Sequence, residues 1–179
     1  MNRLRHIFVW LSRVTHSRGF GIQSPNDYWI ERHVINETLP YYSYATMGQD
    51  DDWLTQKLGR LYFRLANWRQ PSLICSDRYQ EYLHAGCRTA RILPPPLPAG
   101  ATVEMARIDT CGANREQLLR LLRATDDHSL LILENIQRNR ELWHEVLADE
   151  RVRITFDLYD CGIVLFDKKR AKTNYIINF

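Results

Sequence analysis

The second half of the chain constrains the fold most strongly, because strand-like and helix-like segments alternate along it. Residues 129–133 form a continuous apolar run, which is typical of a parallel strand buried on both faces. From residue 103 onward the expected order is strand, helix, strand, helix, strand, strand, over 103–109, 114–123, 129–133, 139–147, 152–158 and 163–166. This alternation predicts a parallel sheet with helices packed on it. The short Gly162 turn between the last two strands predicts a closing antiparallel hairpin.

The N-terminal part of the chain is predicted to be helical. Apolar residues recur at helical spacing over 3–14, with Arg and His between them, which indicates an amphipathic helix. We expect that helix to dock on its own domain; a membrane-surface helix and a partner-binding helix are the alternatives. Ser24 and Pro25 predict a helix start, with the helix over about 25–37. A long helix is expected to begin after three aspartates and to end at Pro71.

These segments predict one structural domain. Residues 1–70 are expected to be a helical segment packed on a reduced Rossmann-like α/β unit formed by residues 71–179. Residues 72–76 and 88–93 are candidate strands, Asp126 and Asp127 a candidate turn, and residues 175–179 a candidate last strand. The number of strands between residues 72 and 102 is left open by the pattern.

Composition excludes several classes of protein. The chain has 179 residues, is 45% hydrophobic, and carries a net charge of +3, which fits one globular domain and points to no particular partner. Its four cysteines lack zinc-ligand spacing, so we expect reduced thiols. The apolar run over 7–11 is too short for a signal peptide or a membrane span. We therefore expect a cytoplasmic protein without a membrane span, and the basic residues lack the interleaved aromatics of a nucleic-acid site.

Several segments resemble a bacterial family of class I S-adenosylmethionine (SAM) methyltransferase-like proteins, of the O-methyltransferase type. Residues 18–25 are similar to that family's RGFG-x-HSP segment, residues 39–44 to its PYYAY segment, and residues 61–67 to its LLFRLxN helix. Near the C-terminus, the similar segments are 131–136, 154–159, 162–166 and 172–177. The resemblance covers about 1–71 and 103–179. It implies a class I methyltransferase fold with a mostly parallel sheet, a C-terminal antiparallel hairpin and an N-terminal helical extension.

The middle of the chain departs from this family. The family's first strand runs into a glycine-rich turn that lets the backbone approach the cofactor, whereas residues 74–82 contain no glycine. Tyr79 and Tyr82 are expected to fill the pocket instead. The 26 residues from 77 to 102 allow one compact crossover, or two at most, where a full domain has three. One or two strand–helix units, with the acidic residue that would hold the cofactor ribose, are therefore expected to be missing.

One set of polar residues is a candidate metal site. Asp109 ends one predicted strand, and Glu134 and Asn135 end the next, so all three belong to the edge where open α/β sheets place their sites. In the metal-dependent O-methyltransferases, an Asp and an Asp-Asn pair at similar places hold a divalent cation. The resemblance thus implies that these residues bind Mg²⁺ or a similar ion. Alternatively, Asp109 and Asn135 are helix caps.

The leading hypothesis is a degenerate, non-catalytic methyltransferase-like protein that acts by binding itself, as a homodimer, or a protein partner. It requires no cofactor. One alternative is an active SAM-dependent O-methyltransferase with an altered cofactor site; another is a divalent-metal-dependent enzyme or binder. Catalytic residues are not identified, because His84, His128 and His144 are candidate bases by residue type alone.

Overall fold

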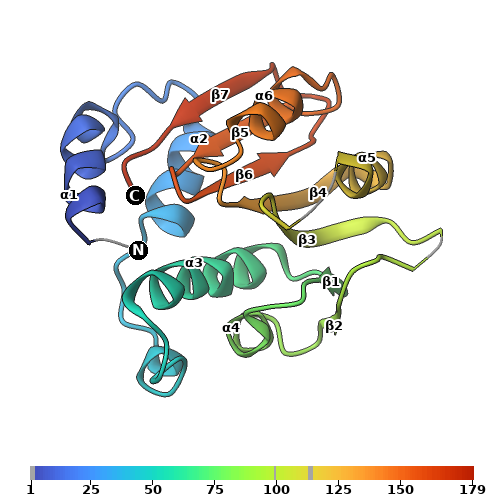
Figure 1. Cartoon of the computed structure of the whole chain (residues 1–179), viewed down its shortest axis with the longest axis horizontal. Helices are drawn as coiled ribbons and strands as arrows, with labels where there is room; N and C mark the ends of the chain where they lie inside the picture. The colour runs from blue at the N-terminus through green and yellow to red at the C-terminus, as the bar shows by residue number, and fades with distance from the viewer. Residues whose placement is uncertain (1–2, 99, 113–114) are drawn as a thin grey trace.

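The computed structural model describes residues 3–98, 100–112 and 115–179, and it is an α/β fold with one mixed, mostly parallel sheet between two helical layers (Figure 1). The seven strands lie in the order β2-β1-β3-β4-β6-β5-β7. Their bounds are β1 Leu73–Cys75, β2 Arg91–Leu93, β3 Val103–Asp109, β4 Thr125–Glu134, β5 Ile154–Asp157, β6 Cys161–Leu165 and β7 Thr173–Ile176. The architecture is compatible with a Rossmann-like fold, as the sequence predicts.

The direction of the strands agrees with the predicted hairpin. Strands β2, β1, β3 and β4 pair in parallel, whereas β6 runs antiparallel to both β4 and β5. Strand β7 pairs in parallel with β5 at the outer edge. The region between residues 72 and 102 contributes two strands, joined by the helix α4 (Gln80–Gly86), so a single helical crossover fits there. From β2 to β3 the described residues form no helix.

Helices cover the two faces of the sheet unequally (Figure 1). The long helix α3 (Trp53–Arg69) and α4 lie on one face, together with α2 (Pro25–Ile30), while α5 (Arg115–Arg123) and α6 (Arg140–Ala148) lie on the other. Leu130 and Ile132 of β4 pack in the core beneath α3, and the alternating Leu131 and Leu133 pack beneath α5 and α6. Both faces of β4 are therefore buried, which explains its continuous apolar sequence.

Two local predictions need comment. The helix expected over about 25–37 is present, but it is α-helical only to Ile30 and continues as a π-helical turn, Glu31–Ile35. Buried Arg64 of α3 donates hydrogen bonds to the carbonyl oxygens of Val34 (2.6 Å) and Ile35 (2.8 Å), so a side chain from another helix stabilises this end. The turn expected at Asp126 lies instead within β4, where the register with β3 is irregular. Residue 114, the expected start of α5, lies outside the described residues.

The N-terminal helix α1 (Arg3–Ser12) is attached through polar contacts. Arg13, directly after the helix, donates hydrogen bonds to the Asp157 carbonyl and carboxylate oxygens, both at 2.9 Å. His6 Nδ1 lies 3.4 Å from Asp160 Oδ2. Burial alone would raise the pKa of Asp157, but hydrogen bonds from Arg140 and Arg13 hold that pKa below its usual value. Asp157 is therefore charged at neutral pH and anchors the end of α1 to β5.

Candidate functional site

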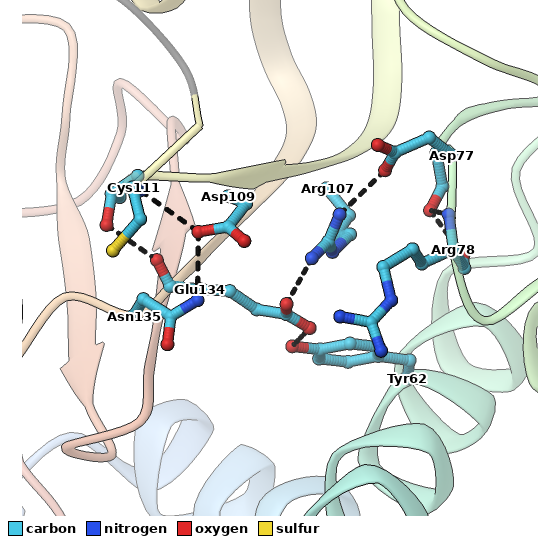
Figure 2. A network of polar contacts seen from close by, with 10 residues as sticks. Tyr62, Asp77, Arg78, Arg107, Asp109, Cys111, Glu134 and Asn135 are labelled. Carbon is cyan, nitrogen blue, oxygen red and sulfur yellow. Dashed lines mark hydrogen bonds and ion pairs between the residues drawn. The ribbon is translucent and has the colours of Figure 1, made fainter.

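The candidate site lies at the carboxyl ends of β1, β3 and β4, where open parallel sheets place their ligands (Figure 2). Asp77 and Arg78 follow β1, Arg107 and Asp109 lie near the end of β3, and Glu134 ends β4. Tyr62 reaches the same place from α3. The parallel pairing of Asp109 with Glu134 brings the ends of β3 and β4 side by side.

A buried ion pair occupies the centre of this edge. The Arg107 guanidinium contacts the Glu134 carboxylate, and their side chains are only 2% and 4% exposed. Tyr62 donates a hydrogen bond to Glu134 Oε1 at 2.7 Å, and Arg107 reaches half-exposed Asp77 at 2.6 Å. Burial and the adjacent Glu134 charge raise the pKa of Tyr62, which keeps its hydroxyl protonated as the donor. Figure 2 shows this chain of contacts running from Asp77 through Arg107 and Glu134 to Tyr62.

Tyr79 fills the space between α3 and the loop that follows β1. Its ring meets the Tyr62 ring edge to face, with centroids 4.8 Å apart, and the Arg107 guanidinium lies 5.7 Å from its centroid. Its φ of 60° places it in the left-handed region at the start of α4, a conformation that glycine adopts at lower cost. A bulky side chain therefore stands at the turn that follows the first strand.

The prediction that Tyr82 fills the same pocket is wrong. Tyr82 is buried on the inner face of α4, and its hydroxyl donates a hydrogen bond to Asp51 Oδ2 at 2.8 Å. An added Cβ on Gly59 of α3 would lie 2.6 Å from the Tyr82 ring, so glycine permits the close approach of these two helices. Tyr82 therefore packs α4 against α3, and Tyr79 alone of the two tyrosines reaches the strand ends.

The structure brings two of the three predicted metal ligands together. Asn135, with φ 59°, donates a hydrogen bond from Nδ2 to Asp109 Oδ1 at 2.8 Å. The Glu134 carboxylate instead engages Arg107 and Tyr62. Asn135 is not the cap of α6, because Asn139 accepts that hydrogen bond from the Leu142 backbone. Within the ranges given above, no three His, Cys, Asp or Glu side chains are grouped to hold a metal ion.

This geometry gives a prediction for metal addition. Millimolar Mg²⁺ or Mn²⁺ is expected to leave the melting temperature of the protein unchanged, because Arg107 competes with any cation for Glu134. Differential scanning fluorimetry with each metal, and with EDTA as the reference, measures the effect. A rise in melting temperature that Asp109→Ala abolishes and Glu116→Ala on α5 retains would establish the metal site instead.

A cleft of about 650 Å³ opens beside these residues, on the face of the sheet that carries α5. It lies between the β2–β3 connection and α5, and its apolar wall includes Cys75, Leu97, Ile108 and Leu121. Charged side chains line it as well: Asp77, Arg78, Arg107, Asp109 and Arg120. The cleft exists because no helix of the described chain covers this part of the sheet between β2 and β3.

The three histidines named as candidate bases do not contribute to this edge. His84 on α4 and His144 on α6 are exposed, and exposed His128 lies near the start of β4, at the opposite end of that strand. Sequence reasoning missed Arg107 and Tyr62. For Arg107 the available signal was its place between the apolar residues Ala106 and Ile108 of the predicted strand, because an arginine is buried there only with a partner.

No helix among the described residues is long and apolar enough to cross a membrane. The chain matches none of the known protein families and none of the curated proteins with which it was compared, so its family is not established by similarity.

Proposed function

We propose that this chain is a non-catalytic, methyltransferase-like cytoplasmic protein that acts by binding, in the first place to a second copy of itself. The order of elements supports the resemblance to class I methyltransferases. That family has three crossovers between its first and fourth strands, whereas this chain has two connections between β1 and β3, and of their described residues only those of the first form a helix. In this proposal, β3 and β4 correspond to the family's fourth and fifth strands, and one strand–helix unit has been lost.

The observation that carries the proposal is the filled turn after β1. A SAM-binding turn needs the backbone close to the cofactor, which glycine allows because it lacks a Cβ. Here Tyr79 stands at that turn against Tyr62 and Arg107, and Arg107 is held by the buried Glu134 carboxylate. Opening this space would remove Tyr79 from the Tyr62 ring and from the guanidinium of the buried Arg107–Glu134 pair, at a free-energy cost. A cofactor in the family's usual position would have to meet that cost.

The cleft supports binding as the function that replaces catalysis. Loss of the crossover leaves Leu97 and Ile108 half-buried beside α5 instead of beneath a helix. Apolar surface rimmed by charged groups is typical of interaction sites, and Arg78 and Asp77 supply opposite charges at one end of this cleft. A symmetric dimer would cover the same cleft on both copies.

A charge placed in the cleft tests this proposal. The wild-type protein is expected to be a dimer at micromolar concentration in size-exclusion chromatography with light scattering, and Leu97→Arg is expected to make it a monomer. The matched control is Leu39→Arg, because Leu39 is 62% exposed and lies outside the cleft. A monomeric wild type, or a Leu97→Arg variant that remains dimeric, would contradict self-association through this surface.

The second candidate function is an active SAM-dependent methyltransferase with a displaced cofactor site. The cleft favours it in one respect, because a volume of about 650 Å³ lies within the range of small-molecule sites, about 300–1,000 Å³. Asp77 and Asp109 also reach the cleft from the carboxyl ends of β1 and β3. A cofactor bound there would avoid the space filled by Tyr79.

A further inference from the structure

The helix α1 turns polar side chains toward the protein, with Val9 and Trp10 beside them, and leaves several of its apolar side chains exposed. His6 and Arg13, two turns apart, face the body and contact Asp160 and Asp157. Phe8 and Leu11 point outward and are 71% and 54% exposed. An amphipathic surface helix normally buries its apolar stripe in the core. In α1, by contrast, Phe8 and Leu11 are exposed while His6 and Arg13 make the contacts with the body.

Packing under α1 is correspondingly incomplete. A pocket of about 300 Å³ remains between the helix and the body, bordered by His6, Trp10, Trp53 and Lys57. The helix is therefore held by Arg13 and His6 and by the rim of this pocket, while Phe8 and Leu11 remain exposed. The helix thus docks on its own domain, as expected, through Arg13 and His6.

The exposed stripe continues beyond the helix. We call the outer apolar patch the α1 face; it consists of Phe8, Leu11, Val14 and Phe20. Phe20 is 79% exposed, between Gly19 and Gly21, which both have positive φ. In Figure 1, α1 lies at the outer edge of the molecule, away from the strand ends of the candidate site. The α1 face is therefore a surface separate from the cleft beside α5.

Charge identifies the kind of surface that would cover the α1 face. The first 26 residues contain four arginines and no acidic residue. Among them, exposed Arg18 precedes Phe20 by two residues and exposed Arg5 lies over the Tyr159 ring, whereas Arg13 is used internally. Apolar and aromatic side chains flanked by arginines suit the boundary of an anionic bilayer, where side chains insert about 5–10 Å and arginines meet lipid headgroups. A second copy fits less well, because a symmetric contact would bring like charges together without an acid to neutralise them.

From this geometry we infer that α1 and Phe20 bind the surface of an anionic lipid bilayer, with α1 lying in the plane of the interface. The helix does not span the bilayer, since its 10 residues reach only about 15 Å. This inference is independent of the proposed function, because it concerns a different surface. If both proposals hold, the protein binds its second copy through the cleft while α1 holds it at a membrane surface.

Vesicle flotation of the full chain tests the inference. The protein is expected to float with vesicles of phosphatidylcholine containing about one third phosphatidylserine, and to remain at the bottom with pure phosphatidylcholine. High salt is expected to reduce the bound fraction, because it screens the arginines. The variant Phe8→Glu/Leu11→Glu is expected to lower the apparent affinity at least about tenfold. Both side chains are exposed, so its melting temperature is expected to match that of the wild type.

Matched controls separate lipid binding from general charge effects. Leu39→Glu/Tyr42→Glu introduces the same charge at two exposed apolar residues outside the α1 face and is expected to float like the wild type. Arg5→Gln/Arg18→Gln is expected to weaken flotation, whereas Arg91→Gln/Arg123→Gln is not. A wild type that fails to float at low salt overturns the inference. Equal losses in the test and control pairs, or a dimer that Phe8→Glu/Leu11→Glu dissociates without any lipid binding, would overturn it as well.

Discussion

Substitution of Arg107 by methionine is expected to lower the free energy of unfolding by about 3–5 kcal/mol. Methionine keeps the apolar stem but removes the charge that neutralises Glu134, whose side chain is 4% exposed. Both side chains are buried, so the carboxylate left behind has no counter-ion and little access to solvent, and the Tyr62 hydroxyl alone cannot compensate it. Half-exposed Asp77 also loses a partner, but water can solvate it.

Chemical denaturation measures this effect, and a second substitution identifies its cause. Arg107→Met/Glu134→Gln removes both charges and is expected to recover most of the lost stability, because the neutral amide still accepts the Tyr62 hydrogen bond. Arg91→Met, at an exposed arginine on β2, is the matched control and is expected to change stability by less than about 0.5 kcal/mol. A small loss in Arg107→Met, or a double variant no more stable than the single one, would contradict a buried ion pair.

The second large effect is expected at Trp143, which is 1% exposed and packs α6 on the sheet. Trp143→Ala is expected to cost about 3–5 kcal/mol, because it removes a large buried side chain and leaves a cavity. Gly162 of β6 makes room for this ring: an added Cβ there would lie 2.4 Å from the indole. Gly162→Ala alone is therefore expected to destabilise by about 1–3 kcal/mol through overpacking.

The two positions are expected to be coupled. In the Trp143→Ala background, Gly162→Ala should cost little, because the indole that it would meet is gone. Thermal unfolding of the four proteins in a double-mutant cycle measures the coupling. Additive effects of the two substitutions would contradict the close contact between Gly162 and the indole.

The parts of the fold that the sequence predicted are those in which burial alone determines the pattern. Strand β3 has the predicted bounds, Val103–Asp109, and the closing antiparallel hairpin is present, but its turn lies at residues 158–160 and Gly162 belongs to β6 instead. Strand β4 begins earlier than predicted. The sequence favours a turn at the acidic pair Asp126 and Asp127, but in the structure this segment belongs to the strand. There the Ser129 hydroxyl donates a hydrogen bond to the Val103 carbonyl oxygen and accepts one from the Asp126 backbone N–H. Tertiary hydrogen bonds of this kind leave no local signal.

The candidate site was harder to predict than the fold. The sequence places Asp109, Glu134 and Asn135 correctly at strand ends, and the first and last of these do meet. The contact between Glu134 and Arg107 could not be predicted, because it depends on the register between β3 and β4. Glu134 pairs with Asp109, so Arg107 lies two residues away from it along the neighbouring strand. The orientation of α1 was missed for a similar reason, since a periodic apolar stripe does not reveal which way it faces.

Isothermal titration with SAM and with its demethylated product tests the central claim, that the cofactor space is filled and the chain acts without catalysis. The claim predicts no binding heat up to millimolar ligand, and no rise in melting temperature, since a ligand that binds only the native state at a hundred times its Kd would add about 2.7 kcal/mol of stability. Saturable binding of either ligand, retained in Leu39→Arg and lost on Asp77→Ala, would contradict the claim and establish a cofactor site in the cleft.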